Sequence, residues 1–228
     1  SVAYKTKPEM GTFMREWLSL YDSKSGERGI FNRQSAIKQA AKNGRRDTEH
    51  DFGCNPCSEI ILRPYQFCNL SEVVVRENDT TDTLKEKVRL ATILGTFQAT
   101  LTNFKYLRKI WKDNTEEERL LGVSLTGIMD NVLTAKAGDK LATVLELLKD
   151  TAVQTNAAMA KQLNIPQSTA VTCVKPSGTV SQLTDAASGI HARHNPYYIR
   201  TVRGDNKDPL TQFLMSQGIP AEPDVMKP

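Results

Sequence analysis

Residues 52–60 read Phe-Gly-Cys-Asn-Pro-Cys-Ser-Glu-Ile, and a third cysteine follows at Cys68. In an extended segment alternate side chains point to the same side, so Asn55, Cys57 and Glu59 are expected to share one face. An amide, a thiol and a carboxylate would then address one small molecule together. The proline between them disfavours helix, which predicts a loop or the entry to a strand. Loops on a rigid scaffold often present reactive groups, so this stretch is the first candidate active site.

The cysteines also allow other interpretations. Cys54 and Cys57 form a Cys-x-x-Cys, which is typical of a thioredoxin-like redox pair or of half a zinc site. A zinc site needs four ligands, and the remaining Cys68 and Cys173 do not form a second Cys-x-x-Cys. A thioredoxin motif requires a helix directly after the cysteines, and no helical pattern follows Cys57. A further alternative is that all four cysteines are buried as small hydrophobic residues.

Composition narrows the function classes only slightly. The 228 residues suffice for one good core or one large domain. The 30 basic and 26 acidic residues give a net charge of +4, too small to favour direct nucleic-acid binding. The chain shows neither an apolar run long enough for a membrane nor a signal peptide. Four cysteines in a chain of this length do not make a disulfide framework, so a cytoplasmic location is expected.

Hydrophobic periodicity predicts several elements. A core-facing helix is expected within residues 1–22, a turn-rich connection at 23–29, a long helical region from residue 83, a helix start at 114–118 and a further helix over 139–163. Short buried strands are expected at 60–62 and 73–75, and residues 120–127 are strand-like. The helical region from residue 83 places ten apolar residues on its expected core face: Leu84, Val88, Ala91, Ile93, Leu94, Phe97, Leu101, Phe104, Leu107 and Ile110.

A second informative stretch begins with an apolar segment at 170–175 and continues into a turn. Backbone amides at a strand-to-helix turn point at one spot, and the helix dipole favours an anion there. A glycine lets the backbone approach a ligand closely, and hydroxyl side chains add donors. Taken alone, the turn is more simply explained as structural. The candidate phosphate-binding residues are Pro176, Ser177, Gly178, Thr179, Val180 and Ser181.

Together the two stretches resemble ribonucleotide reductases, in which an Asn-x-Cys-x-Glu finger loop performs radical chemistry and a Pro-Ser-Gly-Thr turn holds the substrate phosphates. Segments 26–32, 122–127 and 189–200 also look like parts of this family, in the expected order. The chain is most similar to the adenosylcobalamin-dependent (class II) ribonucleoside-triphosphate reductases, over nearly all of its residues. The resemblance therefore implies reduction of ribonucleoside triphosphates to 2'-deoxyribonucleotides by thiyl-radical chemistry.

The resemblance also implies the fold, which is an α/β barrel of ten strands in two parallel halves with the finger loop at its centre. The chain would supply the finger loop, at about 52–60, and most of the second half, so that residues 1–228 form part of one catalytic domain. It would then be a fragment, a piece of a split enzyme or a compact variant. A second polypeptide or a missing N-terminal half would complete the barrel.

Individual roles follow from the resemblance, residue by residue. Cys57 matches the cysteine that becomes a thiyl radical and abstracts the 3'-hydrogen. Glu59 matches the carboxylate that accepts the 3'-hydroxyl proton, and Asn55 matches the amide that binds the ribose hydroxyls. Cys68 matches one of the two cysteines that reduce the substrate and end as a disulfide. Cys54 and Cys173 have no catalytic counterpart, so they are interpreted as packing residues.

The resemblance further implies a cofactor and partners. Adenosylcobalamin would bind largely to regions outside this chain, and an external dithiol such as thioredoxin would restore the thiols. No metal ligand is expected. The spacing of eleven residues between Cys57 and Cys68 favours class II over an iron-dependent class I large subunit.

One alternative belongs to another class of protein. It is a non-catalytic module in which Cys54, Cys57 and Cys68 bind zinc and a basic hairpin near residues 191–203 binds nucleic acid. His191 and His194 could face a nucleotide, but a surface hairpin anchored by Tyr197 and Tyr198 is equally consistent with the sequence. Both histidines are therefore left out of the catalytic set.

Overall fold

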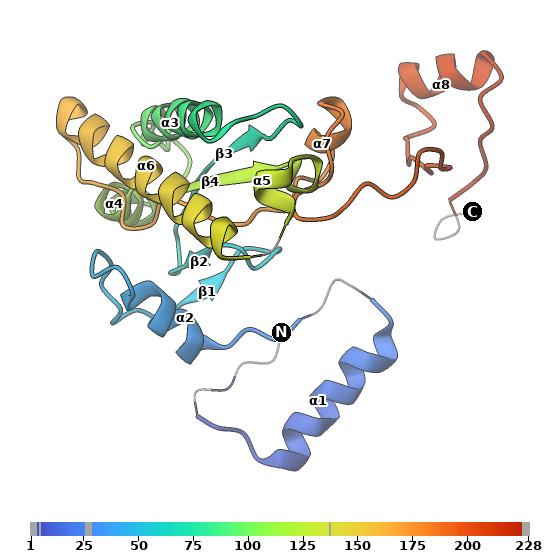
Figure 1. The fold of residues 1–228 in the computed structure, drawn as a ribbon. Helices are drawn as coiled ribbons and strands as arrows, with labels where there is room; N and C mark the ends of the chain where they lie inside the picture. The colour runs from blue at the N-terminus through green and yellow to red at the C-terminus, as the bar shows by residue number, and fades with distance from the viewer. Residues whose placement is uncertain (1–3, 5, 26–28, 137, 225–228) are drawn as a thin grey trace. The chain divides into compact units, whose positions relative to one another are not determined.

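The computed structural model describes residues 4, 6–25, 29–136 and 138–224, in two compact units, Ser1–Ala192 and Arg193–Pro228. The first unit mixes helices with short strands, which confirms the α/β class (Figure 1). Its strands are β1 (Gly53–Cys54), β2 (Ile61–Leu62), β3 (Asn69–Val74) and β4 (Leu121–Thr126). Its helices are α1 (Met10–Ser23), α2 (Arg33–Ala41), α3 (Thr81–Gln98), α4 (Lys109–Glu118), α5 (Val132–Ala135), α6 (Asp139–Leu163) and α7 (Val180–Leu183), with a 3₁₀ turn η1 (Ile128–Asp130). The second unit contains α8 (Pro209–Ser216).

The sheet that positions the candidate site is the parallel pair β3–β4. Its register runs from Asn69 opposite Leu121 to Val74 opposite Thr126. The connection between these strands contains α3 and α4, as a parallel crossover requires. The strands predicted near 73–75 and 120–127 are therefore confirmed, although β3 begins four residues earlier than expected.

A third segment lies along the other edge of β4 but forms no regular strand. It makes one parallel bridge, between Val123 and Thr172. The amides of Leu121 and Val123 donate to the successive carbonyls of Ala170 and Val171, at 3.0 and 2.9 Å. A regular parallel pairing would use carbonyls two residues apart, so the segment skips one position there. The apolar strand expected from residue 170 is thus reduced to an irregular edge.

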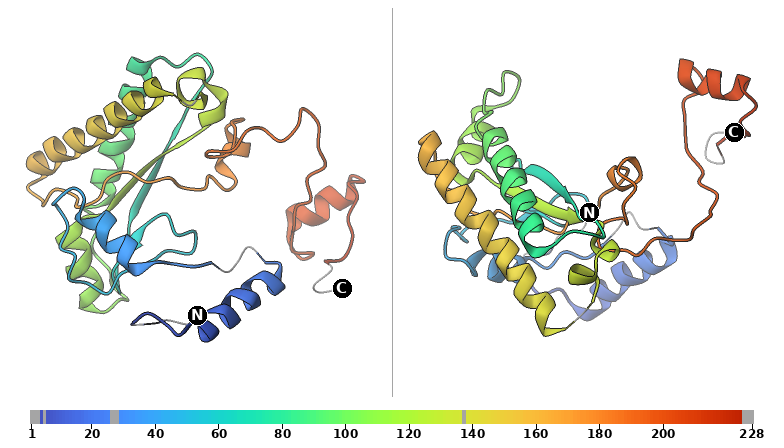
Figure 2. Two further views of the ribbon diagram at one scale, coloured as in Figure 1. Left: turned by 60° about the horizontal axis from the view of Figure 1, so that its bottom comes forward. Right: turned by 45° about the horizontal axis from the view of Figure 1, so that its top comes forward.

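Helices α3 and α6 lie side by side on one face of this sheet (Figures 1 and 2). A capping box between Thr80 and Thr83 starts α3. Asn164 in a left-handed conformation ends α6, so the helix predicted over 139–163 is confirmed. Gly95 brings α3 close to the sheet, because a Cβ there would lie 3.3 Å from Leu121 Cδ2. The buried apolar core between helices and sheet consists of Val73, Val75, Leu84, Val88, Ala91, Ala99, Leu121, Val123, Leu148, Ala152 and Val171.

The predicted core face of the helical region from residue 83 is only partly correct. Leu84, Val88 and Ala91 are buried, but the next buried positions are the small residues Thr92, Gly95 and Thr96. The helix backbone approaches the sheet so closely that large side chains do not fit between them. Helix α3 then ends at Gln98. Five residues expected in the core are therefore exposed instead: Leu94, Phe97, Leu101, Leu107 and Ile110.

Two further helix predictions are wrong. Residues 114–118 end α4 rather than starting a helix, and Arg119 terminates it in a left-handed conformation with φ 47°. Helix α1 forms where predicted but has no buried residue, and its Trp17 and Leu18 are exposed. Amphipathic periodicity indicates that one face of a helix packs against something apolar, but it does not show that the packing partner belongs to the same chain. Of the turn predicted at 23–29, residues 26–28 lie outside the described residues.

Within the described part of the chain, no helix combines the length and apolarity that a membrane span requires.

Candidate active site

Residues 52–60 lie in a hairpin loop. Strands β1 and β2 pair antiparallel, and the Asn55 amide donates to the Ile60 carbonyl at 3.4 Å. The Ile60 amide donates back to the Asn55 side chain, Oδ1, at 3.0 Å, while Ser58 takes a left-handed φ of 64°. The loop is therefore a curled turn, and the extended geometry expected from the sequence is wrong. The curl exposes Cys57 at the tip and turns the Glu59 side chain inward, where it is 3% exposed.

The loop packs over the face of the β3–β4 sheet that the helices leave free. Gly122 of β4 provides the space: a Cβ there would lie 2.5 Å from Leu70 Cδ2, 3.0 Å from Cys173 Sγ and 3.3 Å from Ile60 Cδ1. A residue from the loop, one from β3 and one from the irregular edge thus meet above this glycine. The absence of a side chain at Gly122 is what allows the loop to lie against the sheet.

Lys175 joins the loop to the third segment of the sheet. Its ammonium Nζ lies 2.9 Å from Glu59 Oε1 and 3.9 Å from Cys57 Sγ. Burial raises the pKa of the Glu59 carboxyl, but Lys175, the backbone amide of Glu59 and the Asn55 amide together outweigh it, so the net pKa is lowered. Lys175 and the Asn55 side chain are thus polar partners of the carboxylate, although neither oxygen accepts a hydrogen bond of full geometry. Glu59 is therefore a buried, ionised group with capacity for a further hydrogen bond.

Two further thiols belong to the same electrostatic cluster. Burial raises the pKa of Cys68, and the Glu59 carboxylate raises it further. Burial also raises the pKa of Cys173 to about 12, with added contributions from Glu59 and Cys68. Both are therefore protonated thiols at neutral pH. Cys54 instead contacts Ser58, with Sγ 3.4 Å from Ser58 Oγ.

A second carboxylate, Glu72 of β3, faces the same side of the sheet as Cys68 by strand alternation. Its Oε1 is buried without a hydrogen-bond partner. Burial raises the pKa of Glu72, and Thr126 and Lys175 only partly oppose this. Sequence reasoning missed Glu72, Lys175 and a site role for Cys173. Their signal was the alternation Cys-x-Leu-x-Glu at 68–72 and Cys-x-Lys at 173–175.

The predicted phosphate turn directly follows Lys175. Gly178 has a left-handed φ of 57°, and a Cβ there would meet nothing within 4 Å, so the turn borders open space. Ser177 pairs with Ser188 at 2.9 Å between hydroxyl oxygens. The Ser181 hydroxyl is buried without a partner. Helix α7 has four residues, so the backbone turn, rather than a helix dipole, is the feature available to an anion.

The turn is held at the C-terminal end of β4. The Lys175 amide donates to Ser124 Oγ at 3.0 Å, and the Gly189 amide donates to Thr126 Oγ1 at 2.9 Å. The Gly127 amide donates to the Ala187 carbonyl at 2.8 Å. Both ends of the loop 175–189 are thus fixed to one strand end, the usual place for a ligand site in a parallel sheet.

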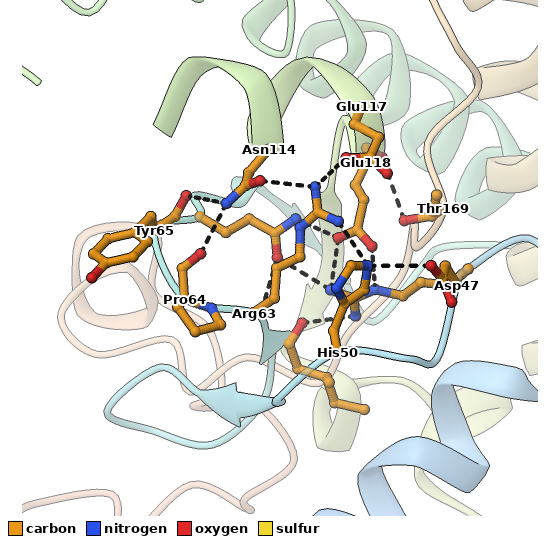
Figure 3. A network of polar contacts seen from close by, with 12 residues as sticks. Asp47, His50, Arg63, Pro64, Tyr65, Asn114, Glu117, Glu118 and Thr169 are labelled. Carbon is orange, nitrogen blue, oxygen red and sulfur yellow. Dashed lines mark hydrogen bonds and ion pairs between the residues drawn. The ribbon is translucent and has the colours of Figure 1, made fainter. Parts of the chain in front are cut away.

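A buried polar network anchors the base of the hairpin to α4 (Figure 3). Arg46 forms a bidentate pair with Glu118, at 3.0 and 2.8 Å, and also donates to the Ile61 carbonyl. Arg63 bonds Glu117, Asn114 and the His50 ring. Both side chains of the Arg46–Glu118 pair are 3% exposed. The loop therefore rests on a rigid support rather than on the sheet alone.

Other candidate features receive less support. Among the described residues no three His, Cys, Asp or Glu side chains are grouped to hold a metal, so the zinc module lacks a ligand set there. His191 is exposed, and Tyr197 and Tyr198 are 94% and 50% exposed, so the alternative in which these tyrosines anchor a surface hairpin has no support from their burial. A surface pocket lined by residues between Thr100 and Lys112 contains none of the candidate residues.

Fold and site together define an α/β protein in which a hairpin loop sets a thiol and a carboxylate over one face of a parallel sheet. The chain is similar to the adenosylcobalamin-dependent ribonucleoside-triphosphate reductase of Lacticaseibacillus paracasei, with 29% identity over 236 residues, 91% of this chain and 31% of that protein. The enzyme of the same name from Euglena gracilis is 30% identical over 210 residues, 90% of this chain and 28% of the relative.

A crystal structure of a B12-dependent (class II) ribonucleotide reductase superposes with a TM-score of 0.58 at 27% identity, over 80% of this chain and 28% of that one. No protein-family model matches. The resemblance inferred from the motifs is confirmed by these similarities. The chain spans between 26% and 31% of the length of the curated relatives it matches.

Proposed function

We propose that this chain forms the radical-loop part of the active site of a class II ribonucleotide reductase, which reduces ribonucleoside triphosphates to 2'-deoxyribonucleotides. The observation behind the proposal is the cluster of Cys57, Glu59 and Cys68 on one sheet face, in a chain similar to such enzymes over most of its length. In this function Cys57 forms the thiyl radical and Cys68 is one of the reducing thiols.

Glu59 and Asn55 suit the binding of a ribose. The Glu59 carboxylate is ionised and buried, and its oxygens have capacity for a further hydrogen bond from a substrate hydroxyl. A carboxylate in this state is able to accept the 3'-hydroxyl proton. The Asn55 side chain closes the loop through its oxygen, and its NH₂ group, which also acts on the Glu59 carboxylate, has a second N–H that would donate to a ribose hydroxyl.

We assign the substrate phosphates to residues 176–181. The support is the open space at Gly178 and the unpartnered hydroxyl of Ser181. Backbone amides and hydroxyls at a glycine turn form a suitable concavity for an anion. Pro176, Ser177, Thr179 and Val180 shape the same turn.

The parallel β3–β4 pair would belong to the second half of a ten-stranded barrel with the loop at its centre. Another polypeptide region would supply the remaining strands, and the protein would work in the cytoplasm with an external dithiol such as thioredoxin. Adenosylcobalamin would bind largely outside this chain, and when bound it supplies the one-electron event that makes a thiyl radical. The exposed tip position of Cys57 fits that requirement, since its sulfur is accessible from outside the loop.

The test uses the completed enzyme, meaning this chain together with the region that supplies the rest of the reductase. It is mixed anaerobically with a ribonucleoside triphosphate, a dithiol and adenosylcobalamin. Deoxyribonucleotide is then measured by chromatography, and a sulfur-radical signal by electron paramagnetic resonance. Both should depend on the cofactor and disappear in Cys57→Ala. Activity restored only by an iron or manganese subunit would assign the protein to class I, and one bound zinc per chain without activity would favour the binding module.

A further inference from the structure

Lys175 contacts both the Glu59 carboxylate and the Cys57 thiol. The 2.9 Å distance to Glu59 Oε1 makes a close ion pair, and the 3.9 Å distance to Cys57 Sγ is within the range of a hydrogen bond to sulfur. The Lys175 side chain is 28% exposed, whereas that of Glu59 is 3% exposed. The ion pair is therefore only partly accessible to water, and a charge there is not screened as it would be on an open surface.

The backbone of Lys175 is fixed as well as its side chain. Its amide donates to Ser124 Oγ on β4, and the next residue begins the turn at 176–181. The lysine thus has its main chain on the sheet, its charge on the hairpin loop and the candidate phosphate site immediately after it. A buried carboxylate requires a partner of opposite charge, and here that partner comes from a segment more than a hundred residues away in the sequence.

We propose that Lys175 is a positioning residue of this active site, serving as counter-charge that holds the buried Glu59 carboxylate beside the Cys57 thiol and ties the loop to the phosphate turn. The inference rests on the proposed function for its catalytic meaning. The contact itself does not depend on that function. Lys175 acts through Glu59 and Cys57 and needs no contact with the substrate.

Several charged or titratable groups face this pair and act on it. Lys175 interacts with Glu59, Cys57, Cys68, Cys173 and Glu72, and Glu59 also acts on Cys68 and Cys173. The hydrogen bond to Glu59 raises the pKa of Lys175, more than burial lowers it. Among these groups Lys175 alone is cationic, so removing its charge leaves the cluster with carboxylates and thiols only. Burial then acts on Glu59 without its main opposing charge, and its pKa should rise.

The first measurement needs no catalysis. Carboxyl-labelled glutamate in the 228-residue chain is titrated by carbon-13 NMR, at a concentration where sedimentation shows no self-association, and Glu59→Gln assigns the signal. Lys175→Met should shift the Glu59 titration to higher pH, while Lys175→Arg should keep it close to the native position. Lys105→Met, which removes an exposed lysine in an irregular segment, is the matched control and should change nothing. An unchanged Glu59 titration in folded Lys175→Met overturns the proposal.

A reciprocal measurement covers the case in which Lys175→Met does not fold. Nitrogen-15 NMR of the lysine side chains should show a lower Lys175 pKa in Glu59→Gln than in the native chain, because the carboxylate that raises it is gone. No difference would contradict the ion pair just as directly.

The second readout is the pH profile of the completed enzyme. With Glu59 as proton acceptor, activity falls as the pH drops through its pKa, so Lys175→Met should lose activity at higher pH than the native enzyme. Its kcat should fall by about tenfold or more, with little change in KM, and Lys175→Arg should restore most of it. If Lys175→Met loses activity at the same low pH as the native enzyme, the positioning role is overturned. A native enzyme without reductase activity would refute the proposed function, while the NMR titrations would still decide the role of the ion pair.

Discussion

Glu59 is held ionised inside the protein, and this has a consequence for stability. Its pKa in the folded chain lies below the ordinary value of 4.5, so the folded state favours the charged form. The stability that this contributes is fully present above pH 4.5 and is lost as the pH falls through the lower, folded pKa. Glu59→Gln should therefore be less stable than the native chain near neutral pH, and the difference should vanish in acid. Urea unfolding at a series of pH values measures it, and a constant difference would contradict the sign.

The cysteines should separate by role. In the completed enzyme, Cys57→Ala should abolish the radical signal and turnover, because no other exposed thiol lies at the loop tip. Cys68→Ser should keep the radical signal but block reduction. Cys54→Ser should keep turnover and cost at most about 1–3 kcal/mol of stability through packing. Single-turnover product analysis beside spin counting measures these effects. Turnover abolished by Cys54→Ser in a folded protein would show that the roles are wrongly assigned.

At this scale the sequence predicted the residues of the loop but not their neighbours. Asn55, Cys57 and Glu59 come from one short stretch, so their proximity follows from local spacing. Lys175 and Cys173 belong to a segment more than a hundred residues away, which forms only an irregular edge of the sheet. Val171 lies in the apolar core and Cys173 lies beside Gly122, although strict alternation would place both residues on one face. The spacing Cys-x-Lys at 173–175 thus indicates that these two residues share a face but not which face of the sheet they take.

Among the elements, the hairpin depends on the buried ion pair between Arg46 and Glu118. Removing one partner leaves an uncompensated buried charge, so Glu118→Gln or Arg46→Met should lower the free energy of unfolding by about 3–5 kcal/mol. Arg89→Met is the matched control, since Arg89 and Glu86 form an exposed pair within one helix. It should change stability little. If chemical denaturation gave the same loss of stability for Arg46→Met as for the control Arg89→Met, the network would not support the hairpin.

The helix that the sequence predicted best has a buried face and a clear C-terminal stop signal. Helix α6 has its end at Asn164 with Pro166 just beyond, and its range agrees with the prediction. Helix α4 was misread because acidic residues at 116–118 are typical of a first turn. Here these residues end the helix. The buried Glu118 carboxylate is stabilised by its ion pair with Arg46 rather than by the helix dipole. Tertiary contacts decided what local composition left open.

At the scale of the whole molecule, the 228 residues by themselves should not turn over substrate. The proposed reaction needs a radical cysteine, two reducing thiols and a cofactor site, and the chain spans about a quarter to a third of its relatives. The chain should reduce no nucleotide when given adenosylcobalamin and an excess of dithiol. Addition of the completing region should restore turnover. Deoxyribonucleotide formed by the 228 residues in isolation would contradict this.

Strand β3 has a sheet partner on one side only in the described part of the chain. The amides of Asn69 and Val75 point to β4, so by alternation those of Leu70, Glu72 and Val74 point to the open side. An unpaired edge of this kind is a template for strands of other molecules. The isolated chain should therefore aggregate as its concentration rises, which sedimentation velocity would detect, and a completing strand should suppress this. Handling of the protein in the laboratory thus depends on the same edge that would close the barrel.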